Sequence, residues 1–323
     1  MDALVIGESV LDVVQAPGLA PVERPGGSAV NVAVALARLG RPVRLATSYG
    51  DDAAGALVAA HLRAAGVAPA GSPLVLGATS RAEAVIGTDG GASYAFDMGW
   101  ALPSGLDADL DLDLDGAVHV VHVTSQAPLL APGAADTFAL VERLRGAGAT
   151  ITYDINLRPA VTGTGPDVAA AVLRMAALAD VVKASDEDLL ALWPDRFVGE
   201  SATALLALDG GPVAVVVTHG GEGASWHACS GADWSTGGVH APPVDVADTI
   251  GAGDTFAAAL VDHLWPLLGP GGRERICALG PDDWAAALAY AARAAAVTVG
   301  RVGADPPTRD ELSEPASREG GTV

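Results

Sequence analysis

The sequence has 323 residues, of which half are hydrophobic, and its formal charge at pH 7 is −21. Such a negative charge argues against a nucleic acid or an anionic membrane as the partner, because both are bound through basic surface. Glycine, proline or a charged residue interrupts every apolar stretch before it reaches the roughly 18 residues that a transmembrane helix needs.

The first residues, Met-Asp-Ala-Leu-Val-Ile-Gly, resemble an opening strand rather than a signal peptide, so we expect a cytoplasmic protein. Only two cysteines occur, Cys229 and Cys277, and neither belongs to a CxxC motif or a Cys/His cluster. We therefore expect neither a structural zinc site nor a disulfide framework.

Short apolar runs alternate with longer amphipathic segments along most of the chain, which is typical of buried parallel strands joined by helices. The predicted strands are residues 3–7, 43–47, 118–123, 150–153, 181–182 and 213–217. The clearest predicted helices are residues 28–39, 52–65 and 253–264. The expected fold class is α/β, with a doubly wound, mostly parallel sheet flanked by helices.

Residues 81–88 and 92–97 depart from this rhythm, because they predict two strands joined by the turn Asp89-Gly90-Gly91. They indicate a small β appendage outside the main sheet. A lid over a ligand and an edge hairpin are both compatible with this pattern.

Polar residues stand at or just after the ends of the predicted strands: Glu8, Thr47, Thr124, Ser125, Asp154, Lys183 and Thr218. The carboxyl ends of parallel strands form the crevice in which such sheets bind ligands, so these residues are candidates for one cleft. The alternative for any one of them is an ordinary polar strand end at the surface.

The glycine-rich segment 248–260 runs into an apolar helix and contains Asp254. Amide groups at a helix start suit the negative charge of a phosphoryl group, and an aspartate beside them can accept a proton from an attacking hydroxyl. The alternative is that Asp254 only caps the helix. Neither a GxxxxGK[ST] loop nor a strand followed by GxGxxG is present, so the common nucleotide-binding motifs find no support.

Residues 26–31 open the first predicted helix, where Gly27 allows close approach of a ligand and Asn31 offers both a donor and an acceptor to a polyol. A second reading makes Ser28 an ordinary N-cap.

These residues together resemble the ribokinase-like family of sugar kinases, also called the phosphofructokinase B-type family, over almost the whole chain. Residues 26–40 and 248–260 resemble its N-terminal and C-terminal signatures. Between them, Asp154-Ile155-Asn156-Leu157-Arg158-Pro159 resembles its D-x-N-x-R-P motif, and residues 182–188 and 217–224 follow in the expected order.

The resemblance implies a role for each matching position. Asp254 would be the base that activates the acceptor hydroxyl, and the amides of Gly251, Ala252 and Gly253 would form an anion hole. Asp12, Gly27 and Asn31 would hold sugar hydroxyls, and Arg158 would contact the substrate or the transferring phosphate. The ATP side would be formed by Lys183, Ser185, Thr218, Gly220 and Gly223.

ATP and magnesium are the implied cofactors. The family's N-x-x-E motif, which organises water around magnesium, here reads Ser185-Asp186-Glu187-Asp188, so Asp188 takes the glutamate position and Glu187 is the alternative. Some relatives also bind potassium, for which Asp248, Ile250 and the turn 301–303 stand at the matching positions.

Residues 297–308 resemble the ending of bacterial fructokinases, so fructose is the expected substrate. The alternatives are 2-keto-3-deoxygluconate, against which Asp97 argues, and ribose or a nucleoside. A non-catalytic regulator on the same fold and a nucleotide-dependent dehydrogenase have less support. We expect one kinase domain over residues 1–313 with a lid insertion around 73–100, a flexible tail over 314–323, and a lid surface that allows a homodimer.

Overall fold

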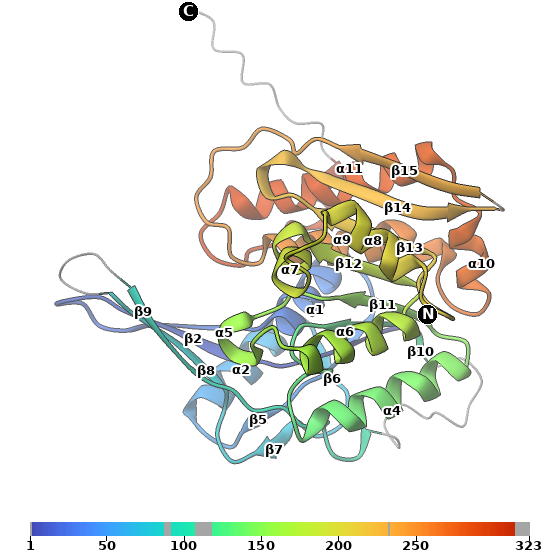
Figure 1. The fold of residues 1–323 in the computed structure, drawn as a ribbon. Helices are drawn as coiled ribbons and strands as arrows, with labels where there is room; N and C mark the ends of the chain where they lie inside the picture. Colours follow the sequence, from blue (N-terminus) through green and yellow to red (C-terminus); the bar gives the residue numbers. More distant parts are fainter. Residues whose placement is uncertain (1, 87–91, 107–117, 232, 314–323) are drawn as a thin grey trace, which may run out of the picture.

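A nine-stranded sheet forms the centre of the molecule in the computed structural model, which describes residues 2–86, 92–106, 118–231 and 233–313 (Figure 1). The predicted turn 89–91 and the predicted tail 314–323 lie outside these residues. Across the sheet, the strands run in the order β15 (Asp233–Val239), β14 (Ala224–Ser230), β13 (Ala214–Thr218), β12 (Val181–Ser185), β11 (Thr150–Asp154), β10 (Val118–Thr124), β1 (Asp2–Ile6), β4 (Val43–Ala46) and β6 (Ala68–Pro69).

All neighbouring strands from β6 to β13 are parallel, whereas β13, β14 and β15 pair antiparallel. The six predicted strands correspond to β1, β4, β10, β11, β12 and β13. Successive side chains of a strand point to opposite faces, so β1 contributes Ala3 and Val5 to one core and Leu4 and Ile6 to the other. The sheet is therefore buried on both faces, as a doubly wound parallel sheet requires.

Helices cover both faces of this sheet (Figure 1). The core of Ala3 and Val5 includes residues of α1 (Ser28–Arg38), α2 (Ala53–Ala64), α9 (Ala252–Leu264) and α11 (Pro281–Val299). The core of Leu4 and Ile6 includes residues of α4 (Gly133–Gly146), α6 (Pro166–Leu178), α7 (Asp186–Leu192) and α8 (Val198–Leu206). The shorter helices are α5 (Pro159–Thr162), α10 (Gly272–Cys277), α12 (Arg309–Ser313) and the 3-10 turns η1 (Gly220–Glu222) and η2 (Trp265–Leu267). No helix within the described ranges is long and apolar enough to cross a membrane.

The three predicted helices correspond to α1, α2 and α9, each within one residue of its predicted ends. Asp52 is the N-cap of α2, and its carboxylate accepts a hydrogen bond from the Gly55 amide at 2.7 Å. Such a side-chain cap satisfies an amide that has no partner inside the helix. Aspartate is therefore a favoured N-cap residue, and its position in the sequence predicts where this helix begins.

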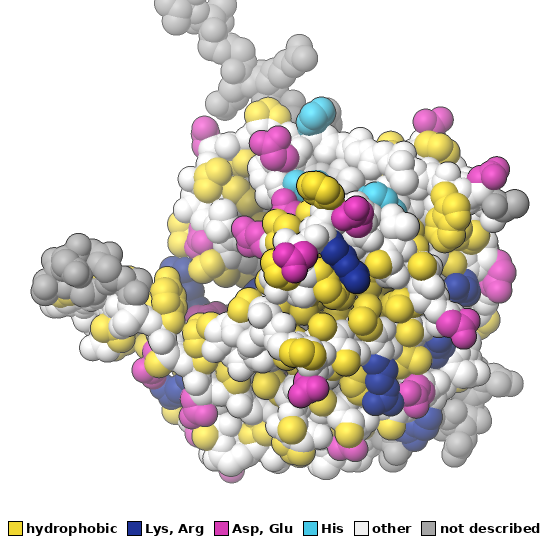
Figure 2. Space-filling view, in the orientation of Figure 1, with side chains coloured by type: hydrophobic (Ala, Val, Ile, Leu, Met, Phe, Trp, Pro, Cys, Tyr) yellow, Lys and Arg dark blue, Asp and Glu magenta, His cyan; other side chains and the backbone are white. Residues whose placement is uncertain are grey.

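A second sheet of four strands stands out from the body of the molecule (Figures 1 and 2). Its strand order is β3 (Val22–Gly26), β2 (Val10–Gln15), β8 (Arg81–Ile86) and β9 (Ala92–Asp97). Strands β8 and β9 form the predicted antiparallel hairpin, but half of the sheet comes from residues 10–26, which were not predicted as strands. Pro25 and the short segment after β1 obscure the strand pattern there. A small separate sheet pairs β5 (Tyr49–Gly50) with β7 (Leu74–Leu76).

The buried carboxylate of Asp262 holds the far end of α9 in place. It accepts hydrogen bonds from Arg41, Arg309 and the Tyr290 hydroxyl, the last at 2.7 Å. Burial and this carboxylate raise the pKa of Tyr290 to about 12. Helix α9 is thus fixed to α11, to the segment after α1 and to the first residue of α12.

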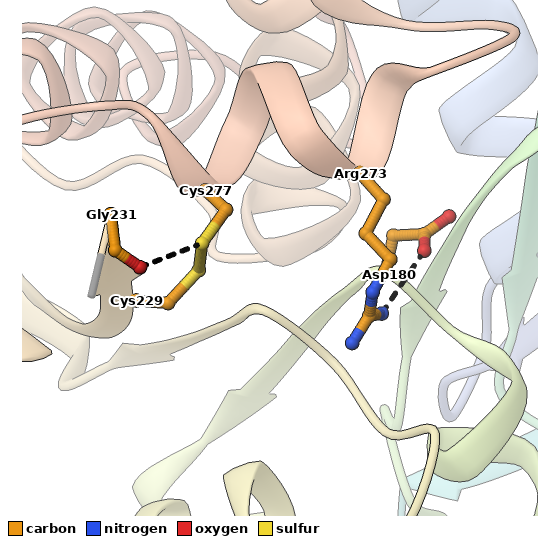
Figure 3. Close-up of a disulfide and its surroundings, with 5 residues drawn as sticks. All are labelled: Asp180, Cys229, Gly231, Arg273 and Cys277. Atoms are coloured by element: carbon orange, nitrogen blue, oxygen red, sulfur yellow. Dashed lines mark hydrogen bonds and ion pairs between the residues drawn. A yellow bond between two sulfur atoms is a disulfide. The ribbon is translucent and has the colours of Figure 1, made fainter. Parts of the chain in front are cut away.

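Cys229 on β14 and Cys277 on α10 form a disulfide, with Cα atoms 5.2 Å apart (Figure 3). The expectation of no disulfide is therefore wrong, because the packing of α10 against β14 brings together cysteines that lie 48 residues apart. On the same helix, Arg273 donates to Asp180 at 3.3 Å (Figure 3). The closed loop contains β15 and all of α9.

We expect reduction of this disulfide to lower the melting temperature. Closing a loop of this length removes entropy from the unfolded chain, which stabilises the fold by roughly 4 kcal/mol and corresponds to a shift on the order of 5 °C or more in a chain of this size. Differential scanning calorimetry with and without dithiothreitol measures the shift. A Cys229→Ser variant should melt lower and no longer respond to dithiothreitol, and an equal response of both proteins would contradict the stabilising role.

Candidate active site

Side chains from the carboxyl ends of the parallel strands meet the first turns of α1 and α9. Ser28, the first residue of α1, contacts Thr124 at the end of β10 at 2.6 Å. Lys183 on β12 donates to Asp154 at the end of β11 at 3.0 Å. The predicted gathering of strand ends is therefore observed for these residues. Thr47 is buried, but its hydroxyl has no hydrogen-bond partner among the described residues.

Asp254 lies in the first turn of α9 and is only 6% exposed. Its Oδ1 accepts hydrogen bonds from Ser28 Oγ at 2.6 Å and from Asn156 Nδ2 at 3.2 Å. Its Oδ2 accepts one from Asn31 Nδ2 at 2.8 Å. Donors from two other parts of the chain thus hold both carboxylate oxygens in one orientation.

The structure argues against a helix cap as the main role of Asp254. The N-cap of α9 is Gly251, and no side chain caps this helix. Both oxygens of Asp254 instead receive donors from outside α9. The Asp254 carboxylate therefore points toward α1 and Asn156 and does not cap the amides at the start of α9.

The expectation that Ser28 caps α1 is also wrong. The N-cap is Gly27, whose φ of 101° places it in a region that side-chain-bearing residues rarely adopt. A Cβ at this position would lie 2.7 Å from the Glu8 carbonyl oxygen. Because Gly27 occupies the cap position, the Ser28 hydroxyl is available to donate to Asp254.

The loop before α9 makes a tight turn at Gly251, the N-cap of the helix. Gly251 adopts a φ of 74°, and a Cβ there would lie 2.5 Å from the Cβ of Ala304, so only glycine fits. The first amides of an α-helix have no partner within the helix and carry the positive end of its dipole. The Ala252 amide makes a long contact of 3.3 Å with the Thr249 carbonyl oxygen.

Lys183 and Asp154 form a buried ion pair beneath this loop. An ideal Cβ on Gly253 would lie 3.3 Å from Lys183 Nζ, so the ammonium lies directly behind the start of α9. Burial raises the pKa of Asp154 to about 7, although Lys183 opposes this shift. Burial disfavours the charged form of Lys183, but Asp154 and Asp188 outweigh it and raise its pKa. A positive charge is therefore held below the amides of the loop.

Asp188 and Asp248, the two predicted metal residues, each bridge backbone amides. Asp188 accepts hydrogen bonds from the amides of Leu157 and Ser185, both at 2.8 Å, and completes a capping box with Ser185. Asp188 is buried whereas Glu187 is exposed, so Asp188 is the residue directed into the fold.

Asp248 accepts hydrogen bonds from the amide of Ile250 at 3.0 Å and from that of Gly303 at 2.9 Å. Burial tends to raise its pKa, but these amides outweigh the effect and lower it. No cluster of three or more His, Cys, Asp or Glu side chains with metal-binding geometry occurs in the part of the chain that the structure describes. A carboxylate oxygen with one amide donor can still accept from a metal-bound water, so Asp188 fits magnesium only through water.

Two acids, Glu8 and Asp12, lie close enough to Arg158 to interact with its charge. Burial raises the pKa of Glu8 to about 7 and that of Asp12 to about 6, and in both cases the Arg158 guanidinium opposes the shift. An ideal Cβ on Gly26 would lie 2.5 Å from Asp12 Oδ2, so the glycine leaves room for this carboxylate. The group offers donors and acceptors of the kind that a polyol requires.

A cavity of about 550 Å³ lies between α9, α11 and the segment after β15. Its lining includes Thr218, Gly220, Gly223, Ala252 and Gly253, which joins the predicted ATP residues to the start of α9. Lys183 and Ser185, which were also predicted on the ATP side, do not line it. Lys183 lies behind the loop instead, and Ser185 is the N-cap of α7.

Comparison with known proteins identifies the family. Residues 3–311 match the pfkB family carbohydrate kinases. The chain belongs to this family. The resemblance inferred from the motifs is confirmed, and the protein is an ATP-using sugar kinase with an alcohol group as acceptor.

Individual relatives are fructokinases. The chain is 34% identical over 269 residues to a fructokinase of Rhizobium leguminosarum bv. trifolii, covering 81% of this chain and 79% of that one. A fructokinase of Xylella fastidiosa with bound ATP superposes with a TM-score of 0.81 at 27% identity, over 96% of both chains. A double mutant of Vibrio cholerae fructokinase in a form with fructose, ADP and potassium superposes with a TM-score of 0.75 at 26% identity, also over 96% of both chains.

Asn156 is a site residue to which the sequence analysis assigned no role. It and Ser125 are the two residues other than glycine with positive φ, 37° and 54°, in the described part of this kinase. Ser125 Oγ donates to the Asn156 carbonyl oxygen at 3.1 Å, and Asn156 Nδ2 donates to Ser28 at 2.8 Å as well as to Asp254. Such strained residues cluster at functional sites. The motif contained Asn156, but only the hydrogen bonds of the folded chain show that its side-chain amide points at Ser28 and Asp254.

Two substitutions of Asn156 distinguish the effect of its side-chain amide on turnover from the cost of its positive φ in stability. We expect Asn156→Ala and Asn156→Gly to lower kcat to a similar extent, roughly 10- to 100-fold, because both remove a donor that orients Asp254. Only glycine adopts the positive φ without strain, so the glycine variant should be about 1 kcal/mol more stable than the alanine variant. Steady-state kinetics and thermal melting on the same preparations give both quantities. If glycine restored kcat along with stability, the orienting role of the amide would be excluded.

Proposed function

We propose that this enzyme transfers the γ-phosphoryl group of ATP to a hydroxyl of fructose. The observation that carries the proposal is the buried carboxylate of Asp254, held by three donors in the first turn of α9, whose residues Ala252 and Gly253 line the cavity. The fructokinase relatives support fructose as the acceptor. The sequence ending at residues 297–308 supports the same sugar.

In the proposed reaction, Asp254 accepts the proton of the attacking sugar hydroxyl. A bond forms between that oxygen and the γ-phosphorus, the bond from the γ-phosphorus to the bridging oxygen breaks, and ADP leaves. The amides of Gly251, Ala252 and Gly253 stabilise the charge on the transferring group, with Lys183 behind them. Asp12, Gly27 and Asn31 hold the sugar, and Arg158 contacts sugar or phosphate. Thr218, Gly220 and Gly223 contact the nucleotide.

A coupled ADP-release assay tests the choice of substrate. Fructose should give the highest kcat/KM in a panel with ribose, adenosine and 2-keto-3-deoxygluconate. The exposed Asp97 lies opposite Arg81 at the end of the hairpin and would repel a sugar acid. A clear preference for any other member of the panel would replace fructose as the acceptor.

Replacing Asp254 with Asn tests the base. The substitution keeps the size of the side chain and removes the proton acceptor, so kcat should fall roughly 10²- to 10⁴-fold. Asp209→Asn, the same substitution at an exposed aspartate to which no role is assigned, is the control and should leave kcat unchanged. Fructose binding and melting temperature, measured on the same preparation, show whether Asp254→Asn remains folded. Retention of more than about a tenth of kcat would contradict the assignment.

We further propose that magnesium and potassium assist the reaction. Magnesium, when bound with ATP, neutralises charge on the β- and γ-phosphates, and Asp188 would hold it through water. Asp248, Ile250 and the turn 301–303 would hold potassium, and the hydrogen bond between Asp248 and Gly303 already joins these segments. EDTA should abolish turnover, and potassium in place of sodium at constant ionic strength should raise it. An unchanged rate on this exchange would remove the potassium proposal.

The four-stranded sheet is proposed as a lid over the sugar and as a surface for a homodimer. It carries exposed apolar side chains, among them Val14, Val22, Val85, Tyr94 and Phe96 (Figure 2). A molar mass in solution of one chain, 32.1 kDa, would contradict the dimer. The division into a kinase domain at 1–313 and a tail at 314–323 and the cytoplasmic location stay predictions.

A further inference from the structure

The cavity assigned to the nucleotide is lined almost entirely by apolar side chains. Valines, alanines, two prolines and Phe256 form its walls, and the only side chains with hydrogen-bonding groups in the lining are those of Thr218 and Thr249. A hydroxyl can donate or accept, so neither threonine distinguishes an amino group from a carbonyl oxygen on a purine ring. Asp245 belongs to the loop over the cavity but does not line it.

Part of the backbone around this cavity offers no group that could identify a base. Pro242 and Pro243 have no N–H, which removes two donors from the loop after β15. Ala292, Ala295 and Ala296 lie inside α11, where amides and carbonyls are bonded within the helix. The carbonyl oxygen of Val299, at the end of α11, accepts hydrogen bonds from the amides of Ala247 at 2.9 Å and Asp248 at 3.2 Å.

The remaining contacts of this cavity suit the flat face of any purine. The side chains of Val244 and Val246 are 40% and 68% exposed, and both line the cavity from the loop, facing a wall that includes the small alanines of α11. Exposed apolar groups at a cavity gain stability when a ring covers them, and this gain depends on contact area rather than on ring substituents. A pyrimidine offers less area than a purine.

We propose that the phosphoryl-donor site does not discriminate between purine bases, so that GTP and ITP also serve as donors. This inference rests on the proposed function, which puts the donor nucleotide in this cavity. Sites that lack directed hydrogen bonds reject related ligands only weakly, whereas sites that hydrogen-bond a substituent reject its absence strongly. The γ-phosphoryl group of GTP would pass to the same sugar hydroxyl, with GDP leaving in place of ADP.

The test is a comparison of kcat/KM for ATP, ITP, GTP and CTP with saturating fructose. We expect the ITP and GTP values to lie within about thirtyfold of the ATP value, and the CTP value to lie below all three. A GTP value lower than this would overturn the inference while leaving the sugar kinase intact. Absence of turnover with every nucleotide would instead contradict the proposed function.

A variant of the cavity wall gives an independent measurement. Val246→Ala should raise KM for ATP and for GTP by the same factor, because the lost contact is common to both bases. Leu57→Ala, which removes a side chain 40% exposed on α2 and outside the cavity, is the control and should leave both KM values unchanged. A change in KM for only one nucleotide on Val246→Ala would show that the wall reads the base and would overturn the inference.

Discussion

The orientation of one buried carboxylate is the constraint on which the site depends. Asp254 receives hydrogen bonds from Ser28 and Asn31 on α1 and from Asn156 after β11. Two of these donors are more than 200 residues away in the chain. The carboxylate of Asp254 therefore has a defined direction only when α1, α9 and β11 are packed together. Substitutions that tilt any of these elements should affect turnover before they unfold the protein.

The proposed nucleotide site places positive groups locally in a strongly acidic chain. The net charge of −21 would repel a nucleotide, yet the site places the start of α9 above the ammonium of Lys183. On the face shown in Figure 2, acidic side chains are spread over the surface rather than gathered in one patch. Arg158, which is proposed to contact sugar or phosphate, is a second local positive group, and it opposes the rise that burial causes in the pKa of Glu8 and of Asp12. Local geometry thus outweighs the overall charge.

The residues proposed to bind the sugar and the cavity proposed to bind the nucleotide differ in chemistry, so we expect their specificity to differ. The sugar side offers carboxylates, an amide and a guanidinium, and unpaired polar groups there would penalise an acceptor that lacks the matching hydroxyls. The nucleotide side offers mainly apolar walls, whose contribution depends on contact area. Selectivity for the acceptor and tolerance toward the donor base are therefore compatible in one enzyme.

The sequence by itself determined the six inner parallel strands and the helices α1, α2 and α9, because apolar runs and helix ends are local signals. It also predicted that Asp254 and its neighbouring glycines stand at the start of a helix, because a glycine-rich segment followed by an apolar helical pattern is a local signal. Only the tertiary structure decided that Ser28 faces Asp254, that Lys183 lies behind the loop, that Cys229 meets Cys277, and that residues 10–26 complete the second sheet. Each of these depends on contacts between distant segments, which no local periodicity encodes.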